Sequence, residues 1–309
     1  MLVIEDNFKQ HIEYKTIIAL GGFDGLHLGH RALLDKTISA SKKLKCKSMV
    51  FTFKNHPLTI INKESAPKLL MNNRDKLKLF EQYGIEIVNM VNFDSEFMKL
   101  SPEEYILALV KYYNATGLVV GFNHRFGYKN LGDIDLLKYL SKTHNFNLYV
   151  VSPVKYKGEI VSSSRIRNLL SEDGDIEKAY KMLTRPYSIE GDVIKGKQLG
   201  RKLGFPTINL NYCSDFLLPR GGVYYTLVEY GGKYHKGITN IGYNPTVENN
   251  KLSIETHIVD FNKELYNENI KINFIKRIRD EKKFNTLTEL SEQLKNDKIF
   301  AIKQNFEII

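Results

Sequence analysis

The hydrophobic pattern of this chain changes character near residue 185, and this change constrains the fold more than any other feature. Before it, short apolar runs alternate with longer stretches of helical periodicity, which is typical of a parallel α/β sheet. After it, short β-type runs are separated by glycine-containing turns, as in a small antiparallel barrel. With 309 residues the chain is long enough for two domains. We therefore expect one domain over residues 1–184 and a second over 185–309.

The apolar periodicity also predicts individual elements. In the first domain the expected strands are Thr16–Leu20, Ser48–Phe53, Ile85–Val91, Leu118–Gly121 and Phe146–Ser152. The expected helices are Leu28–Leu44, Arg74–Tyr83, Pro102–Tyr113, Asp133–Thr143, Ser162–Leu170 and Asp175–Leu183. In the second domain the expected strands are Tyr187–Ile194, Val223–Tyr230, Tyr234–Ile241, Ser253–Val259 and Ile270–Phe274, followed by an amphipathic helix Leu287–Phe306. A hairpin is expected at Gly231–Gly232.

Composition narrows the functional classes. The net charge is +10, which suits a nucleotide-binding surface and also leaves open a protein that binds nucleic acid. The basic residues are scattered and no nucleic-acid motif is present, so we expect no nucleic-acid partner. The two cysteines, Cys46 and Cys213, form no metal-binding pair. We see no signal peptide at the N-terminus and no apolar run long enough to span a membrane, and we expect a cytoplasmic protein without a membrane partner.

The most informative segment of the first half is Gly21-Gly22-Phe23-Asp24-Gly25-Leu26-His27-Leu28-Gly29-His30. It lies where the first expected strand leads into the first helix, the favoured ligand crevice of an open α/β sheet. Glycines there let the backbone approach a phosphate, and the helix start supplies free N–H groups. His27 and His30 are three residues apart and therefore share a helix face. Two imidazoles at this place suit the stabilisation of charge on a leaving pyrophosphate.

This segment resembles the HxGH signature of the nucleotidyltransferase superfamily. A second superfamily element also matches, since Ser162-Ser163-Ser164-Arg165-Ile166-Arg167 opens an expected helix, where hydroxyls and arginines suit a triphosphate. The resemblance implies a Rossmann-like α/β/α domain, with His27 and His30 as catalytic residues. It also implies that ATP is bound by Gly22, Phe23, Asp24, Gly29, Ser162, Ser163, Ser164, Arg165 and Arg167.

A third segment, Gly121-Phe122-Asn123-His124-Arg125-Phe126-Gly127, resembles the loop of bacterial FAD synthetases that lines the flavin and nucleotide pocket. The resemblance implies that Asn123 and Arg125 contact the flavin or the nucleotide. The chain departs from the usual family pattern at Asn123 and at His124, where many members carry a hydrophobic residue.

In the second half, a loop rich in glycine and cations runs from Gly191 to Arg201 and continues as Gly204-Phe205-Pro206-Thr207-Ile208-Asn209. It lacks the spacing of a P-loop. The continuation resembles the PTxN motif of riboflavin kinases, in which Thr207 and Asn209 would bind Mg²⁺ and nucleotide phosphate. Oxygen ligands of this kind suit Mg²⁺. The resemblance implies ATP binding by Gly196, Gly200, Arg201, Gly204, Pro206, Thr207 and Asn209.

The segment Ile254-Glu255-Thr256-His257 matches the strand that carries the catalytic glutamate of the riboflavin kinases. Glu255 is therefore the expected general base for the 5′-hydroxyl of riboflavin. Arg279 is the expected contact on the flavin side.

The resemblance covers residues 15 to 305, with motifs of both halves in order. The chain is identified as a member of the bacterial bifunctional riboflavin kinase/FAD synthetase family. The implied reactions are riboflavin plus ATP to FMN, and FMN plus ATP to FAD with release of pyrophosphate. Two alternatives stay open: a chain in which one module is catalytically inactive, and a basic nucleic-acid-binding protein. The sequence carries no signal for an oligomeric state.

Overall fold

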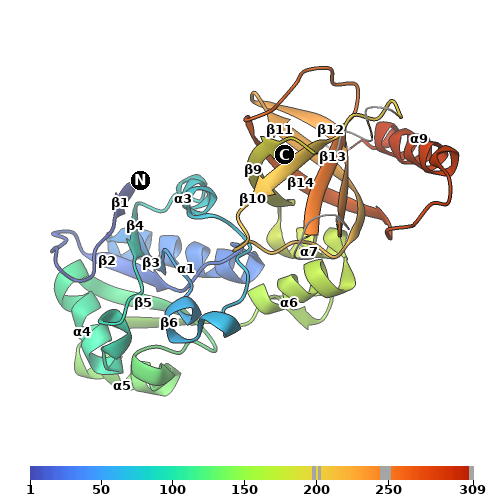
Figure 1. Cartoon of the computed structure of the whole chain (residues 1–309). Coiled ribbons are helices and arrows are strands. Elements are labelled where there is room, and N and C mark those ends of the chain that lie inside the picture. Colours follow the sequence, from blue (N-terminus) through green and yellow to red (C-terminus); the bar gives the residue numbers. More distant parts are fainter. Residues whose placement is uncertain (197–199, 201–202, 244–251, 306–309) are drawn as a thin grey trace. The chain divides into compact units, whose positions relative to one another are not determined.

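The computed structural model describes residues 1–196, 200, 203–243 and 252–305. By its internal contacts the chain divides into two compact units, Met1–Ser162 and Ser163–Ile309 (Figure 1). Each unit has its own sheet and its own core, as the sequence predicts.

The first unit is built on a parallel sheet with the strand order β1-β4-β3-β2-β5-β6. Its strands are β1 (Leu2–Ile4), β2 (Thr16–Leu20), β3 (Lys47–Phe53), β4 (Ile87–Val91), β5 (Ala115–Gly121) and β6 (Asn147–Val151). The central strands are buried on both faces, which explains their continuous apolar runs in the sequence.

Helices cover both faces of this sheet. The long ones are α1 (Leu28–Leu44), α3 (Asn73–Gln82), α4 (Pro102–Tyr113) and α5 (Ile134–Thr143). The shorter elements are α2 (Leu58–Ile61), η1 (Lys63–Ser65), η2 (Phe97–Lys99), η3 (Tyr128–Asn130) and a small hairpin of β7 (Lys155–Tyr156) and β8 (Glu159–Ile160). Helix α4 begins with a capping box between Ser101 and Glu104 and carries Pro102 in its first turn, which are strong start signals.

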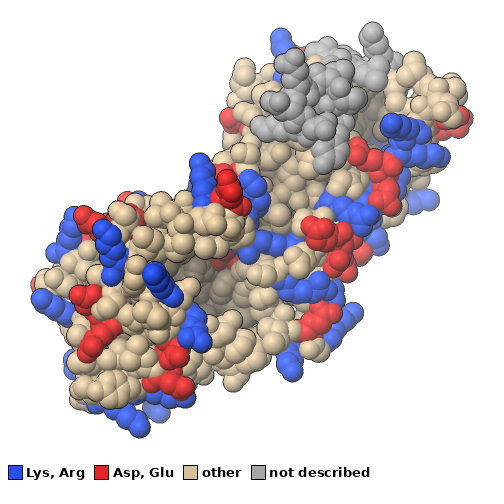
Figure 2. Space-filling model, turned by 60° about the horizontal axis from the view of Figure 1, so that its bottom comes forward, with Lys and Arg blue, Asp and Glu red and all other residues tan. Residues whose placement is uncertain are grey.

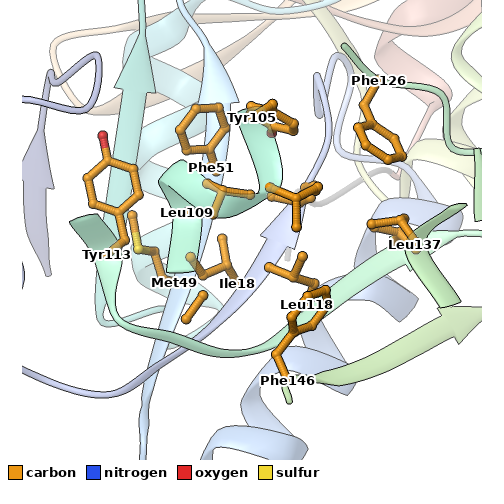
Figure 3. Packing of buried hydrophobic residues seen from close by; sticks show 14 of the residues in the cluster. Ile18, Met49, Phe51, Tyr105, Leu109, Tyr113, Leu118, Phe126, Leu137 and Phe146 are labelled. Atoms are coloured by element: carbon orange, nitrogen blue, oxygen red, sulfur yellow. The ribbon is translucent and has the colours of Figure 1, made fainter. Parts of the chain in front are cut away.

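Two hydrophobic clusters lie on the two faces of the sheet. One packs α4 and α5 against alternate strand residues such as Ile18, Phe51 and Leu118 (Figure 3). The other packs α1 and α3 against the neighbouring strand positions, including Ile17 and Val50. This alternation follows from the two-residue period of a β-strand.

The second unit contains a closed antiparallel barrel with the order β10-β13-β12-β11-β14-β9. Its strands are β9 (Tyr187–Ile194), β10 (Ile208–Tyr212), β11 (Gly222–Tyr230), β12 (Lys233–Tyr243), β13 (Leu252–Ile258) and β14 (Asn269–Arg279). Gly231 and Gly232 join β11 to β12 with φ values of 58° and 72°. Two successive left-handed residues are what a two-residue hairpin turn requires.

Helices flank the barrel at both ends of this part of the chain. They are α6 (Ser163–Asn168), η4 (Leu169–Asp173), α7 (Ile176–Leu183) and α9 (Leu287–Lys303). The backbone N–H of Arg220 donates to the carbonyl of Leu170 at 2.8 Å, and Lys276 on β14 pairs with Glu177 on α7 at 3.5 Å. Residues 163–184 therefore pack with the barrel in the second compact unit. The domain boundary expected between residues 184 and 185 concerns the two enzymatic domains, and it stays a prediction.

The predicted fold class is confirmed, and the differences are local. Strand β1 was not expected, because three residues at a mixed-charge terminus carry no clear period. Strand β5 begins at Ala115, where small residues hide the apolar run. Helix α9 ends at Lys303, and the expected end at Phe306 lies outside the described residues.

Candidate active sites

The sheet of the first unit has its topological switch point between β2 and β5. From β2 the chain crosses to β3 on one side, and from β5 it crosses to β6 on the other, so the strand order reverses between these two neighbours. In an open α/β sheet, ligands bind at the carboxyl ends of the strands at such a switch point. The Gly21–His30 segment follows β2, and the Gly121–Gly127 segment follows β5. The fold therefore brings two sequence-predicted segments to one edge.

The histidine pair forms a compact unit at the start of α1. His27 is the N-cap residue, and its Nδ1 accepts a hydrogen bond from the backbone N–H of His30 at 3.3 Å. The two rings are stacked, with centroids 3.7 Å apart. A Cβ at Gly29 would lie 3.1 Å from the His27 ring, so the glycine of HxGH leaves room for that ring. The expectation that both histidines share a helix face is met.

The turn before the histidines is buried more deeply than its role as a loop suggests. The ring of Phe23 is fully buried and contacts Phe80, with centroids 5.4 Å apart. Asp24 is 8% exposed, and both of its carboxylate oxygens accept the N–H of Leu70, at 3.0 and 3.2 Å. Lys76, which sequence reasoning did not single out, lies buried against the same turn.

The loop after β5 presents Asn123 and Arg125 to solvent. Arg125 pairs with Asp133, the N-cap of α5, at 3.3 Å. The ring of His124 stacks on Phe126, with centroids 5.7 Å apart. Burial lowers the pKa of His124 to about 4, so this ring is neutral near pH 7.

The serine–arginine segment begins where the two compact units meet in the sequence. Val161 belongs to the first unit, and a Cβ at Gly29 would lie 3.5 Å from its carbonyl oxygen. Ser162 follows directly, and Ser163–Asn168 form α6 in the second unit. Arg165 pairs with Asp173 at 3.2 Å. The chain that leads into the serines thus passes beside the HxGH glycine.

In the second unit a cavity of about 260 Å³ lies between the barrel and α9. Its walls are mostly apolar, with a few polar side chains. They are formed by Gly200, Leu203, Phe205, Thr207, Val223, Ile238, Asn240, Glu255, His257, Arg279, Glu281, Lys282, Phe284, Leu290, Leu294 and Asp297. We call this the apolar cavity. Predicted residues Glu255 and Arg279 both line it.

A second cavity of about 320 Å³ is more polar, and we call it the polar cavity. It is lined by residues 206–208, Thr256, Ile258 and residues 261–266. Because strand side chains alternate, Glu255 and His257 line the apolar cavity while Thr256 and Ile258 line the polar one. Strand β13 is therefore the wall between them, and Thr207 contributes to both.

The PTxN residues lie beside this wall. Asn209 is directly opposite Glu255 in the β10–β13 ladder, so their side chains share a face. A Cβ at Gly196 would lie 2.0 Å from the Asn209 amide nitrogen, which explains a glycine there. The carbonyl of Pro206 accepts from Nδ1 of His257 at 2.9 Å, and burial lowers the pKa of that histidine.

Two further predicted residues lie before this segment. Gly204 has a φ of 80°, in the left-handed region that favours glycine. Arg201 lies outside the described residues.

The site residues that sequence reasoning missed share one property. Lys76, His257 and Asp297 are polar or charged, yet they are between 2% and 7% exposed. A Lys or Asp at a polar position of an amphipathic helix is predicted to be exposed. The local sequence therefore gives no sign that Lys76 and Asp297 are buried. Only the folded structure shows that they are buried.

The fold is that of a two-unit transferase, with a nucleotidyltransferase-type sheet and a barrel that contains two cavities separated by β13. Comparison with known families agrees: the FAD synthetase model matches residues 9–165, and the riboflavin kinase model matches residues 183–304. The chain belongs to the family of bifunctional riboflavin kinase/FMN adenylyltransferases. The prediction of two enzymatic modules in this order is confirmed.

Individual relatives span almost the whole chain. A bifunctional riboflavin kinase/FMN adenylyltransferase of Buchnera aphidicola is 36% identical, covering 98% of this chain and 97% of its own. The protein of that name from Bacillus subtilis is also 36% identical, covering 94% and 92%. A crystal structure from Streptococcus pneumoniae, titled a macrolide-efflux protein, is 28% identical with a TM-score of 0.88 and covers 99% of this chain and 100% of its own.

Among the described residues, no helix has the length and the apolar character needed to cross a membrane. On the face shown in Figure 2, Lys and Arg side chains are interspersed with Asp and Glu. A mixed distribution of this kind differs from the continuous basic stripe that nucleic-acid binding uses.

Proposed function

We propose that FMN is adenylylated at the crevice between β2 and β5, with His27 and His30 as the catalytic residues. The stacked histidine pair at the start of α1 carries this proposal. An oxygen of the FMN phosphate attacks the α-phosphorus of ATP, the new O–P bond forms, and the bond to the β-phosphate breaks with release of pyrophosphate. The histidines donate hydrogen bonds to phosphate oxygens as charge builds up, and the crevice aligns the reactants.

The remaining predicted residues divide into two roles in this proposal. Gly22, Phe23 and Gly29 offer backbone to the ATP phosphates, while Asp24 shapes the turn through its bonds to Leu70. The other contacts are assigned to two further segments of the chain. We assign ATP contacts to Ser162, Ser163, Ser164, Arg165 and Arg167, and flavin-side contacts to Asn123 and Arg125. The exposed positions of Asn123 and Arg125 at the end of β5 support this assignment.

We propose that riboflavin occupies the apolar cavity and that ATP occupies the polar cavity. Aromatic and aliphatic walls suit the flavin ring, and Glu255 faces the same space. The 5′-oxygen of riboflavin attacks the γ-phosphorus of ATP, the bond to the β-phosphate breaks, and the proton of the hydroxyl passes to Glu255. Thr207 borders both cavities, so the γ-phosphate passes beside it.

The residues around Thr207 fit Mg²⁺. The Thr207 hydroxyl, the Asn209 amide oxygen and the nearby Glu255 carboxylate are hard oxygen donors on neighbouring strands. The close packing of Gly196 against Asn209 holds that amide in place. Thr207 and Asn209 would hold the ion, which would neutralise charge on the ATP phosphates. Since both reactions consume ATP, we place the protein in the cytoplasm.

A chromatographic assay with separate substrates tests both assignments. The chain is given ATP and Mg²⁺ with either riboflavin or FMN, and the flavin products are resolved. His30→Ala should reduce FAD formation from FMN and leave FMN formation from riboflavin largely intact, while Glu255→Ala should do the reverse. Equal loss of both activities in either variant would contradict separate sites. FMN without FAD from the unmodified chain would show an inactive first module.

A further inference from the structure

The ammonium group of Lys76 contacts the turn that follows β2. Lys76 belongs to α3 and is 5% exposed. Its Nζ donates to the carbonyl of Gly22 at 3.2 Å and to the carbonyl of Phe53 at 3.4 Å. The Gly22 carbonyl also accepts from the Thr52 hydroxyl at 3.1 Å. One buried cation thus binds the chain at the carboxyl ends of both β2 and β3.

These contacts fix the direction of the peptide between Gly22 and Phe23. The Gly22 carbonyl is thereby held toward Lys76 and Thr52, and Phe23, which follows it, is fully buried. Gly22 is exposed, and a Cβ built there would meet no atom within 4 Å. The bonds from Lys76 and Thr52 therefore fix one side of the turn, and the exposed Gly22 leaves its other side open.

The backbone at Phe23 does not adopt this geometry freely. Its φ of 49° lies in the left-handed region, which is unfavourable for a residue other than glycine. Burial of the ring beside Phe80 and His30 holds one side of the residue. The bonds from Lys76 and Thr52 hold the other side. Replacement of Lys76 by an apolar side chain removes one of these bonds, whereas deprotonation of Lys76 removes its positive charge.

The charged groups around Lys76 are few. From the turn, the Asp24 carboxylate faces it and favours its protonated form, but burial outweighs this attraction and lowers the pKa of Lys76 to about 8. The end of β3 contributes the Phe53 carbonyl and the Thr52 hydroxyl. The next residue, Lys54, pairs with Glu5 at 2.5 Å. On α3 itself, the backbone N–H of Asp75 donates to the cap residue Asn72.

We propose that Lys76 is a positioning residue for adenylyl transfer, whose ammonium holds the Gly22 carbonyl and places a positive charge beside the turn that leads to His27 and His30. The inference rests on the proposed location of that reaction beside His27 and His30. Lys76 itself contacts no substrate in this arrangement. It holds the turn in one conformation and supplies a positive charge beside the proposed phosphate site, and preorganised charge makes large contributions to catalysis.

The test compares Lys76→Met and Lys76→Arg with the unmodified chain. FAD formation from FMN and ATP is measured between about pH 6.5 and pH 9.5, and riboflavin kinase activity of the same preparations is the internal control for folding. In the unmodified chain FAD formation should decline above about pH 8, approaching tenfold per pH unit, as the ammonium loses its proton. Lys76→Met should lower kcat about 10- to 100-fold and remove this alkaline decline. Lys76→Arg should restore part of the rate and also lack the decline, because a guanidinium stays charged.

Each result decides the proposal. An unmodified chain without an alkaline decline, or a Lys76→Met variant with normal FAD formation, would overturn it. An unchanged decline in Lys76→Arg would overturn it as well, even if Lys76→Met fails to fold. His30→Ala, measured in parallel, distinguishes a wrong location of the reaction from a wrong role for Lys76. Normal FAD formation by His30→Ala would mean that the reaction site is elsewhere, whereas loss in His30→Ala but not in Lys76→Met removes only the role of Lys76.

Discussion

Arg279 on β14 and Asp297 on α9 form a forked ion pair at the edge of the apolar cavity. Nη2 of Arg279 lies 2.8 Å from Oδ2 of Asp297, and Nε lies 3.2 Å from both carboxylate oxygens. Asp297 is 2% exposed and also accepts from Gln293 at 2.9 Å. The pair ties α9 to the barrel, and α9 contributes Leu290 and Leu294 to the cavity wall. Arg279, predicted from sequence as a flavin contact, is therefore held in place by a residue of the C-terminal helix.

Asp297→Asn should weaken riboflavin binding. The neutral amide cannot balance the guanidinium, and a partly buried cation without its counter-charge costs about 1–3 kcal/mol after allowance for the exposure of Arg279. We expect a KM for riboflavin raised about tenfold, a smaller change in kcat, and a barrel that unfolds at lower urea concentration. FAD formation from FMN should not change.

Asp260→Asn is the matched control. Asp260 also pairs with a cation of α9, Lys298, at 3.0 Å, but its side chain is 75% exposed. An exposed pair contributes about 0–1 kcal/mol, so this variant should keep its KM for riboflavin. Equal effects of the two substitutions would show that the position of Arg279 does not depend on Asp297.

Gly196→Ala should impair the kinase through Asn209. The added Cβ would lie 2.0 Å from the Asn209 amide nitrogen and force that side chain to move. We expect FMN formation to fall about tenfold or more and to need more Mg²⁺. Gly221→Ala serves for comparison, because its Cβ would meet its nearest atom at an ordinary 3.5 Å. Normal kinase activity in Gly196→Ala would remove Asn209 from the proposed ion site.

The sequence predicts most of the fold because its local signals agree with the tertiary structure. Helix α1 has the predicted bounds Leu28–Leu44, and the predicted Gly231–Gly232 hairpin is present. Strand β1 carries no such signal, because pairing with β4 defines it. The same reasoning applies to the sites. The spacing of His27 and His30 places them together, whereas the burial of Lys76 and Asp297 depends on elements distant in sequence.

His124→Phe should preserve FAD formation and remove an acid sensitivity of the first unit. Burial lowers the pKa of His124 to about 4. As pH falls below about 6.5, the unfolded chain takes up the proton first, so the native unit should lose up to about 3 kcal/mol of stability between about pH 6.5 and pH 4. In His124→Phe this loss should be absent from urea unfolding curves. Loss of FAD formation would instead show that the departure from the family pattern at this position is functional.

The burial of Lys76 also predicts a pH dependence of stability, which is opposite in direction to the pH dependence expected for FAD formation. Its pKa is about 8 in the folded chain, against an ordinary value of 10.5. Between these values the unfolded chain binds more protons, so the free energy of unfolding should rise with pH, by up to about 3 kcal/mol. Urea unfolding of the first unit, compared with Lys76→Met at each pH, isolates this contribution. If FAD formation declines above about pH 8 while this difference in stability grows, unfolding cannot explain the decline. A difference that stays constant with pH would mean that Lys76 is not buried as an ammonium.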